Sequence, residues 1–189
     1  MIWTIPGTTI TAQREDTASL RSQFQSLFLG GGIAMSQVSG ITGLDHYMIQ
    51  NWVKRGYLTK PEQKRYSLNQ LCRIITISML KGVLSMERIC TLLRFVNGKL
   101  DDEDDDIISD ADLYFLFLRL AAQARELDTR DQWAQAISAT LEDYQEPFPG
   151  ARERVAQVLR IMLTAWVASR MAQEAENMMA ALELPEQEA

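Results

Sequence analysis

The sequence has few of the side chains from which enzymes and metal sites are usually built. It contains one histidine, His46, and two cysteines, Cys72 and Cys90, which form no CxxC motif. Nucleophilic catalysis needs a base beside the nucleophile, and a structural zinc site needs four cysteine or histidine ligands. We therefore expect no enzyme activity, no metal and no cofactor, with an outward-facing His46 and two buried structural thiols.

Long apolar stretches are also missing. The longest, near residues 113–122 and 161–168, are far shorter than the roughly 20 residues of a membrane-spanning helix. Residues 1–11 include Pro6 and contain no apolar run of the kind found in signal peptides. Together with the low cysteine content, these absences predict a cytoplasmic protein that does not insert into a membrane.

Charge is distributed unevenly along a chain whose net charge is −6. Between residues 45 and 99, ten lysines and arginines oppose three acidic residues, a surplus of seven positive charges. From residue 100 onward, seven arginines oppose twenty acidic residues, a deficit of thirteen. Such asymmetry is typical of a chain in which one part binds a polyanion and the other does not.

Residues 41–67 have the pattern of a helix-turn-helix followed by a short wing. Asp45 is a good N-cap, because its carboxylate can accept from the free amides of the first turn, and Gly56 ends the helix as a C-cap. Apolar residues recur at the spacing of one buried helix face: Ile49, Trp52 and Val53. A tight basic turn follows at residues 60–65.

The opposite face of this helix, residues 45–55, is polar and almost free of acid. Glutamine and asparagine can bind adenine edges in the major groove, lysine favours guanine, and further basic groups bind phosphates. The predicted DNA-binding residues are His46, Tyr47, Gln50, Asn51, Lys54, Arg55, Lys60, Lys64 and Arg65. The alternatives are a merely solvated helix with basic ends, or a surface that binds a protein.

The remaining periodicity is helical, so we predict an all-α fold. The first 15 residues are expected to be irregular, with Trp3 and Ile5 packed against the body, and three glycines at 30–32 to form a hinge, since no phosphate-loop motif follows them. Helices are predicted over residues 17–29, 34–40, 45–55, 68–81, 85–96, 107–127, 130–144 and 151–182, and strands only in the wing.

Several of these helices have an identifiable cap or buried face. Ser67 and Gln70 form a capping box before the helix over 68–81, and Ser85 caps the next helix. The inner face of 68–81 is predicted as Leu71, Ile74, Ile75, Ser78 and Met79. The stripe of the last helix is predicted as Val155, Val158, Leu159, Met162, Trp166 and Met178.

The acidic run at residues 101–106 suggests a domain boundary, because six like charges resist burial. The expected division is an N-terminal segment and helix (1–33), a DNA-binding domain (34–100), the linker (101–106) and a helical C-terminal domain (107–189). A calcium loop using Asp101, Glu103, Asp105 and Asp112 is disfavoured, because Asp106 takes the position that needs glycine. Alternatively, the run folds back on the basic domain and mimics the charge of DNA.

A family resemblance supports the helix-turn-helix. The run GLDHYMIQNWVKRGYLTKP, followed by KRYS and LCRIITISMLKGVLSMERICTLL, resembles the DNA-binding domain of MerR-like winged-helix regulators over residues 34–96. It is closer still to a bacterial group of MerR-like proteins whose function is not established. The resemblance implies a helix-turn-helix, a wing, and then a helix pair.

The resemblance also implies roles for single residues. Gln50 stands where many members have arginine, which removes one expected backbone contact, and Asn51 stands at one of two aromatic positions. Trp52, at the other, would serve the core. Lys64 falls on a phosphate-contacting wing position, and Tyr66 on the aromatic that packs the wing against the body.

The C-terminal half is expected to form a homodimer, because the regulators that the chain resembles bind two half-sites as two-fold pairs. It is also a candidate for binding an effector of unknown identity. Four aromatic residues would suit an apolar pocket there, although core packing is the commoner use: Trp133, Tyr144, Phe148 and Trp166. Metal-sensing members of the family use cysteines in this half, and the chain has none there.

The sequence thus favours a DNA-binding transcriptional regulator whose partner is double-stranded DNA. The second hypothesis is a protein-interaction module or adaptor with the same fold. An enzyme ranks third, because the paired carboxylates lie in the acidic run and no nucleophile has a base at motif spacing.

Overall fold

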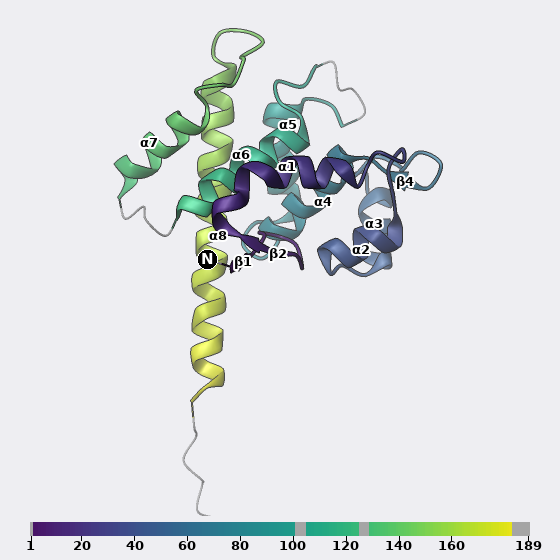
Figure 1. Ribbon diagram of the computed structural model, residues 1–189, viewed down its shortest axis with the longest axis horizontal. Coiled ribbons are helices and arrows are strands. Elements are labelled where there is room, and N and C mark those ends of the chain that lie inside the picture. The colour runs from purple at the N-terminus through teal and green to yellow at the C-terminus, as the bar shows by residue number, and fades with distance from the viewer. Residues whose placement is uncertain (1, 101–104, 125–128, 183–189) are drawn as a thin grey trace, which may run out of the picture.

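The computed structural model describes residues 2–100, 105–124 and 129–182, and in this part of the chain it is mainly α-helical, as predicted (Figure 1). The helices are α1 (Thr17–Ser26), α2 (Met35–Thr42), α3 (His46–Lys54), α4 (Leu68–Leu80), α5 (Met86–Asn97), α6 (Asp110–Gln123), α7 (Arg130–Thr140) and α8 (Ala151–Ala180). A short 3-10 turn, η1 (Arg14–Asp16), precedes α1. The strands are β1 (Ile2–Thr4), β2 (Thr11–Gln13), β3 (Ile33–Ala34) and β4 (Arg65–Tyr66).

Helix α4 lies at the centre of the molecule. It packs against α2, α5, α6 and α8, so its apolar side chains are covered on every side. Four residues of the predicted inner face are buried, but Ser78 is only half-buried. The burial extends to five residues outside that face: Cys72, Arg73, Thr76, Ile77 and Leu80. The prediction of a single inner face was therefore too narrow, because periodicity identifies one stripe and α4 has neighbours all round.

The N-terminal segment is a β-hairpin, so the prediction of irregular structure was wrong. β1 pairs antiparallel with β2, with Trp3 opposite Ala12. Trp3 and Ile5 are buried, as expected. Gly7 has a left-handed φ of 75°, and a Cβ there would lie 2.7 Å from Ile75 Cγ2 of α4. The backbone can approach α4 this closely only with glycine at the turn.

Two helices end earlier than predicted. α1 ends at Ser26 rather than at residue 29, and beyond it Leu27 is exposed and Phe28 half-buried. α7 ends at Thr140 rather than 144. The Tyr144 hydroxyl instead donates to the Ile107 carbonyl.

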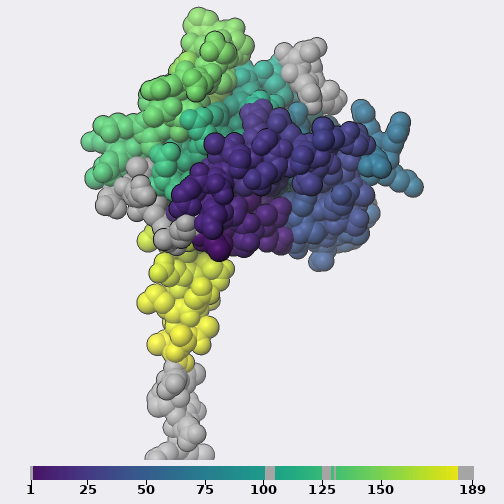
Figure 2. Space-filling view, in the orientation of Figure 1, coloured from purple at the N-terminus to yellow at the C-terminus, as the bar shows by residue number. Residues whose placement is uncertain are grey.

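The first part of α8 packs on α4, α5, α6 and α7, and its C-terminal part projects beyond the body (Figure 2). Trp166 packs edge-to-face on Phe117, with ring centroids 5.9 Å apart, and belongs to the core. Met178 was predicted in the buried stripe but is 66% exposed, because α8 outruns the helices that cover it. The stripe is buried only as far as Trp166.

One hydrophobic core extends from the helix-turn-helix region into the C-terminal helices, since α4 packs against both α6 and α8. Asp105 accepts a hydrogen bond from the Lys99 amide. Residues 101–104 of the acidic run lie outside the described residues, and the domain division at 101–106 stays a prediction. Among the helices that the structure describes, none has the length and apolar character that a membrane crossing needs.

We predict that the free energy of unfolding falls as the pH rises above about 8.5, the ordinary pKa of a thiol. Burial raises the pKa of the Cys72 thiol and of the Tyr114 hydroxyl well above their usual values, and Asp110 raises that of Cys72 further. The unfolded chain therefore loses protons that the folded chain retains. The contribution of the Cys72 thiol to stability is complete below the thiol pKa of the unfolded chain. It is lost as the pH rises toward the raised thiol pKa of the folded chain.

Urea unfolding at a series of alkaline pH values, with reductant present, measures this loss. Cys72→Ala should remove up to about 1.4 kcal/mol per pH unit from the decline. Cys90→Ala should remove less, because Cys90 is only half-buried. An unchanged decline in Cys72→Ala would show that this thiol does not link stability to pH.

Candidate nucleic-acid interface

Helices α2 and α3, joined by a short turn, lie where the sequence predicts a helix-turn-helix. α2 ends at Gly43, whose left-handed φ of 69° turns the chain toward α3, and the Ser39 hydroxyl donates to the Leu44 carbonyl across the turn. Asp45 occupies the N-cap position, as predicted, and its backbone is extended. Its carboxylate, however, makes no capping hydrogen bond, so that part of the prediction was wrong.

The buried and exposed faces of α3 largely follow the prediction. Ile49 and Trp52 are buried, and Val53 is half-buried. Five predicted contact residues of this helix and its cap are exposed: His46, Tyr47, Gln50, Lys54 and Arg55. Asn51 is half-buried, and the Tyr47 side chain is 79% exposed.

A Schellman motif ends α3. The Tyr57 amide donates to the Trp52 carbonyl (2.9 Å) and the Gly56 amide to the Val53 carbonyl (3.1 Å), while Gly56 has a left-handed φ of 73°. The Tyr57 carbonyl in turn accepts from Arg73 Nε at 3.1 Å. The chain leaving α3 is thus tied directly to the central helix.

The basic turn forms a tight hairpin, which we call the basic hairpin (residues 60–65). The Arg65 amide donates to the Glu62 carbonyl at 2.7 Å, and Gln63 and Lys64 between them both have positive φ, at 46° and 64°. This is the geometry of a type I′ turn, which usually takes asparagine and glycine. The hairpin therefore holds Lys64 at its tip in a backbone conformation that costs most residues about 1–2 kcal/mol.

The basic hairpin is anchored on both sides. β4 at its end pairs antiparallel with β3, the strand before α2, and Tyr66 is buried. Arg65 Nη1 donates to the Gly32 carbonyl (2.9 Å). The Gln70 side-chain amide donates to the Thr59 hydroxyl (2.8 Å) and to the Lys60 carbonyl (3.1 Å).

The capping box at the start of α4 is confirmed. The Ser67 hydroxyl accepts from the Gln70 amide, and the Gln70 side chain accepts from the Ser67 amide. Gln70 thus both caps α4 and holds the basic hairpin. The sequence indicated the first role but gave no sign of the second, which depends on tertiary contact.

Helix α3 and the basic hairpin share one surface, at the right of Figure 2. A shallow depression of about 380 Å³ between them is lined by Gln50 and Val53 of α3, by Pro61 and Lys64 of the hairpin, and by Met35 and Tyr66. All three basic residues of the hairpin, Lys60, Lys64 and Arg65, are exposed. Of the predicted residues, the depression brings together Gln50 and Lys64, whereas Lys60 and Arg65 line a second cleft at the base of the hairpin.

The structure also reveals a buried ion pair that the sequence reasoning missed. Arg73 is 7% exposed, and its Nη1 donates to both carboxylate oxygens of Asp110, at 3.1 and 3.3 Å. The sequence feature that could have indicated this ion pair is an arginine inside the otherwise apolar sequence of α4. Through Arg73, the loop after α3 and the start of α6 are held to the same helix.

Other candidate sites find no support in the described residues. Both cysteine thiols are free, and burial raises the pKa of each. Because their pKa values are raised, both thiols are protonated near neutral pH. Asp112, the last position of the disfavoured calcium loop, forms an ion pair with Arg21 (2.5 Å). Asp101 and Glu103 of that loop lie outside the described residues. Nowhere in the described ranges do three His, Cys, Asp or Glu side chains gather closely enough to hold a metal.

The four aromatic residues of the C-terminal half have different surroundings. Trp166 is in the core and Trp133 is half-buried, while Phe148 is 44% exposed beneath the Arg154 guanidinium. Tyr144 lines a cavity of about 670 Å³ between α1, α6 and the end of α7. The effector pocket built from these four aromatics stays a prediction.

Comparison with known proteins identifies relatives for the middle of the chain. Residues 32–117, less than half of the 189, match a family described as a domain of unknown function, DUF1836. An 81-residue stretch is 31% identical to the Uncharacterized protein YkrK of Bacillus subtilis (strain 168), covering 41% of this chain and 35% of that relative. No solved structure matches the chain. The family match extends from the glycine before β3 into α6, and so includes the helix-turn-helix, the basic hairpin, α4 and the start of α6.

Proposed function

We propose that the chain is a cytoplasmic, non-enzymatic DNA-binding transcriptional regulator of the MerR-like kind. In this proposal α3 enters the major groove and the basic hairpin lies along the phosphate backbone as a short wing. The observation that carries it is the shared face of α3 and the hairpin, where exposed polar and basic side chains stand together with Glu62 as the single acid of residues 46–66.

Helix α3 offers the groups that base reading requires. Gln50 presents an amide that can bind adenine through two hydrogen bonds, and Lys54, one turn later, can donate to guanine. Tyr47 offers both a hydroxyl and an apolar ring, which suits a thymine methyl group. Asn51 is half-buried, so its contribution is smaller than that of Gln50.

The basic hairpin supplies phosphate contacts from a fixed position. Glycine would occupy the Lys64 position without strain, yet a lysine stands there at φ 64°. Backbone strain of this kind is concentrated at functional sites, where it places a needed side chain. Because Gln70 and the Gly32 carbonyl hold the hairpin at its base, Lys64 is presented toward a partner rather than collapsed onto the body.

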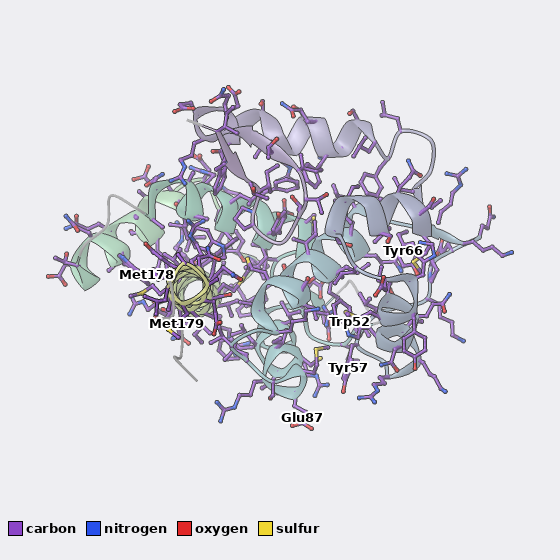
Figure 3. The ribbon with its side chains drawn as sticks, turned by 90° about the horizontal axis from the view of Figure 1, so that it is seen from below. Trp52, Tyr57, Tyr66, Glu87, Met178 and Met179 are labelled. Carbon is purple, nitrogen blue, oxygen red and sulfur yellow. The ribbon has the colours of Figure 1, made fainter. Side chains whose placement is uncertain are left out.

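In a homodimer, the same face of the second subunit would contact a second half-site on the DNA. α8 offers a suitable surface for the contact between the two subunits. Exposed apolar residues recur along its outer side, with alternating three- and four-residue spacing from Ala168 onward, and the spacing continues to Leu182, just beyond the helix end: Ile161, Ala168, Met171, Ala175, Met178 and Leu182. We call this the α8 seam. Met171 and Met178 are 67% and 66% exposed, and Figure 3 looks along α8 with Met178 at its projecting end. A heptad-like seam on a free helix suits packing against a second copy of the same helix.

The second candidate is a protein-interaction module that uses the same face. The exposed ring of Tyr47 favours it, because exposed tyrosines are common in protein interfaces. The two functions differ in their response to salt. Neutralising phosphates releases counterions, which gives a steep salt dependence that a largely uncharged protein interface lacks.

We predict salt-sensitive binding to duplex fragments from beside the chain's own gene, tighter than binding to scrambled duplexes. Removing three exposed basic side chains with Lys54→Ala, Arg55→Ala and Lys64→Ala should weaken binding. The loss of the phosphate contacts of Arg55 and Lys64 should reduce the slope of log K against log salt by nearly 2. Arg65 is left intact because it also holds Gly32. Fluorescence anisotropy over a salt series measures both quantities.

A variant with the same loss of charge elsewhere serves as the control: Arg119→Ala, Arg160→Ala and Arg170→Ala on α6 and α8. It should keep most of the affinity. Gln50→Ala should reduce the preference for the cognate fragment by about 1–3 kcal/mol while leaving the salt slope unchanged. Equal losses in the two triple variants, or no binding beyond that of scrambled duplex, would contradict the proposal and favour the interaction module.

We also predict that the chain self-associates through the α8 seam. Met171→Glu with Met178→Glu places two charges on the seam and should yield a monomer at concentrations where the unchanged chain is dimeric. Gln173→Glu with Asn177→Glu adds the same charge on the opposite side of α8 and should remain dimeric. Sedimentation equilibrium decides between them, and an unchanged chain that stays monomeric throughout would refute the seam as a dimer contact.

A further inference from the structure

The depression between α3 and the basic hairpin differs in character from the polar surface around it. Four apolar or aromatic side chains line it: Met35, Val53, Pro61 and Tyr66. The first three are half-buried, so each keeps part of its apolar surface open to solvent, and Tyr66 is buried. The other two lining residues, Gln50 and Lys64, are exposed. An apolar depression within a surface proposed to bind DNA requires a matching apolar group on the DNA.

The depression lies on the side of α3 that faces the hairpin. Gln50 and Val53 are three residues apart and share this side of the helix. Gln50 is also three residues from Tyr47 and four from Lys54, so it stands at the boundary with the outer face that is proposed to enter the major groove. A base edge in contact with Gln50 would therefore lie next to the depression as well.

The walls of the depression are in place before any partner binds. β3 pairs antiparallel with β4, which places Met35, the first residue of α2, beside the hairpin. The hydrogen bond from the Gln70 side chain to the Lys60 carbonyl holds the hairpin immediately before Pro61. Because no chain segment has to become ordered to form this site, a contact made there is not weakened by an ordering cost.

Thymine carries the apolar group that matches this depression. Base edges in the major groove present hydrogen-bonding groups, and the C5 methyl of thymine is the one apolar group among them. The methyl lies near the backbone of its own strand, as the depression lies between Gln50 of the reading helix and Lys64 of the phosphate-binding hairpin. None of the described residues that line the depression is acidic, so none repels that phosphate. A volume of about 380 Å³ has room for the methyl and part of the sugar beside it.

We propose that this depression is a thymine site within the DNA contact. It receives the C5 methyl of one thymine in each half-site, while Gln50 reads an adenine beside it and Lys64 binds the adjoining phosphate. Met35 and Val53 are then specificity-determining residues, because cytosine, which lacks the methyl, leaves their apolar surface without a partner. This inference rests on the proposed function and narrows it to DNA sites with an A·T pair at this position.

The test uses the full chain and a duplex from beside its own gene that it binds more tightly than scrambled DNA. Each thymine of this duplex is replaced in turn by deoxyuridine, which differs only in lacking the C5 methyl. At one position in each half-site the replacement should weaken binding about fourfold, the factor that corresponds to one buried methyl group (about 0.8 kcal/mol). Fluorescence anisotropy at a fixed salt concentration measures the ratio of the two affinities.

Variants of the chain separate the methyl contact from other effects of uracil on the duplex. Val53→Thr keeps the shape of the side chain but replaces a methyl with a hydroxyl, and Met35→Gln makes a comparable change on α2. Each should lower the thymine-to-uracil affinity ratio to about twofold or less, whereas an effect of uracil on DNA flexibility would persist in both. Tyr47→Ala removes the exposed ring on the outer face of α3 and should weaken binding while keeping the fourfold ratio.

The outcomes distinguish the thymine site from the proposed function. Specific binding in which no thymine is sensitive to deoxyuridine would overturn the thymine site and leave the regulator standing. A fourfold ratio that survives Val53→Thr and Met35→Gln would also overturn it, and loss of that ratio in Tyr47→Ala would place the methyl on the outer face instead. Failure to bind any duplex better than scrambled DNA would reject both the thymine site and DNA binding, in favour of a protein partner. Either depression variant is decisive if the other does not fold.

Discussion

The fold depends on the burial of α4 among helices from both halves of the chain. An apolar helix with neighbours on every side can keep an arginine only if that arginine is fully paired, and Arg73 is paired with Asp110 and the Tyr57 carbonyl. Removing one partner of such a pair typically costs about 3–5 kcal/mol. The same contacts tie the loop after α3 and the start of α6 to α4.

This arrangement explains how a small exposed face can be held rigid. α3 has a single buried side, and β4 at the end of the basic hairpin pairs with the two-residue strand β3. Both are fixed through α4: α3 by the Schellman turn that leads to Arg73, and the hairpin by Gln70. The proposed DNA contact is favoured when its side chains are held in place before binding, and the core provides that order.

Local signals predicted the elements nearest the candidate site well. The glycines at 43 and 56, the capping box of Ser67 and Gln70, and the spacing of Ile49 and Trp52 are all encoded within a few residues. The contacts that hold the site together were not predicted. Arg73 and Asp110 are 37 positions apart in the chain, and Gln70 is 10–11 positions from the residues whose carbonyls it holds. A single sequence does not indicate which residues this far apart come into contact.

The errors have related causes. The hairpin of β1 and β2 is stabilised by docking on α4, which a short, mixed sequence does not reveal. Met178 continues an apolar stripe, yet periodicity cannot tell whether a stripe faces the chain's own core or a partner. That ambiguity made a surface methionine look like a core residue.

The most direct test of the central claim is to map the surface that a duplex touches. Backbone amide shifts of the isotope-labelled chain would be followed by NMR while a duplex of about 20 base pairs, enough for two half-sites, is added at low salt. The account predicts that the largest changes fall on α3 and on the basic hairpin at residues 60–65. Changes confined to other elements, or none at all, would contradict it.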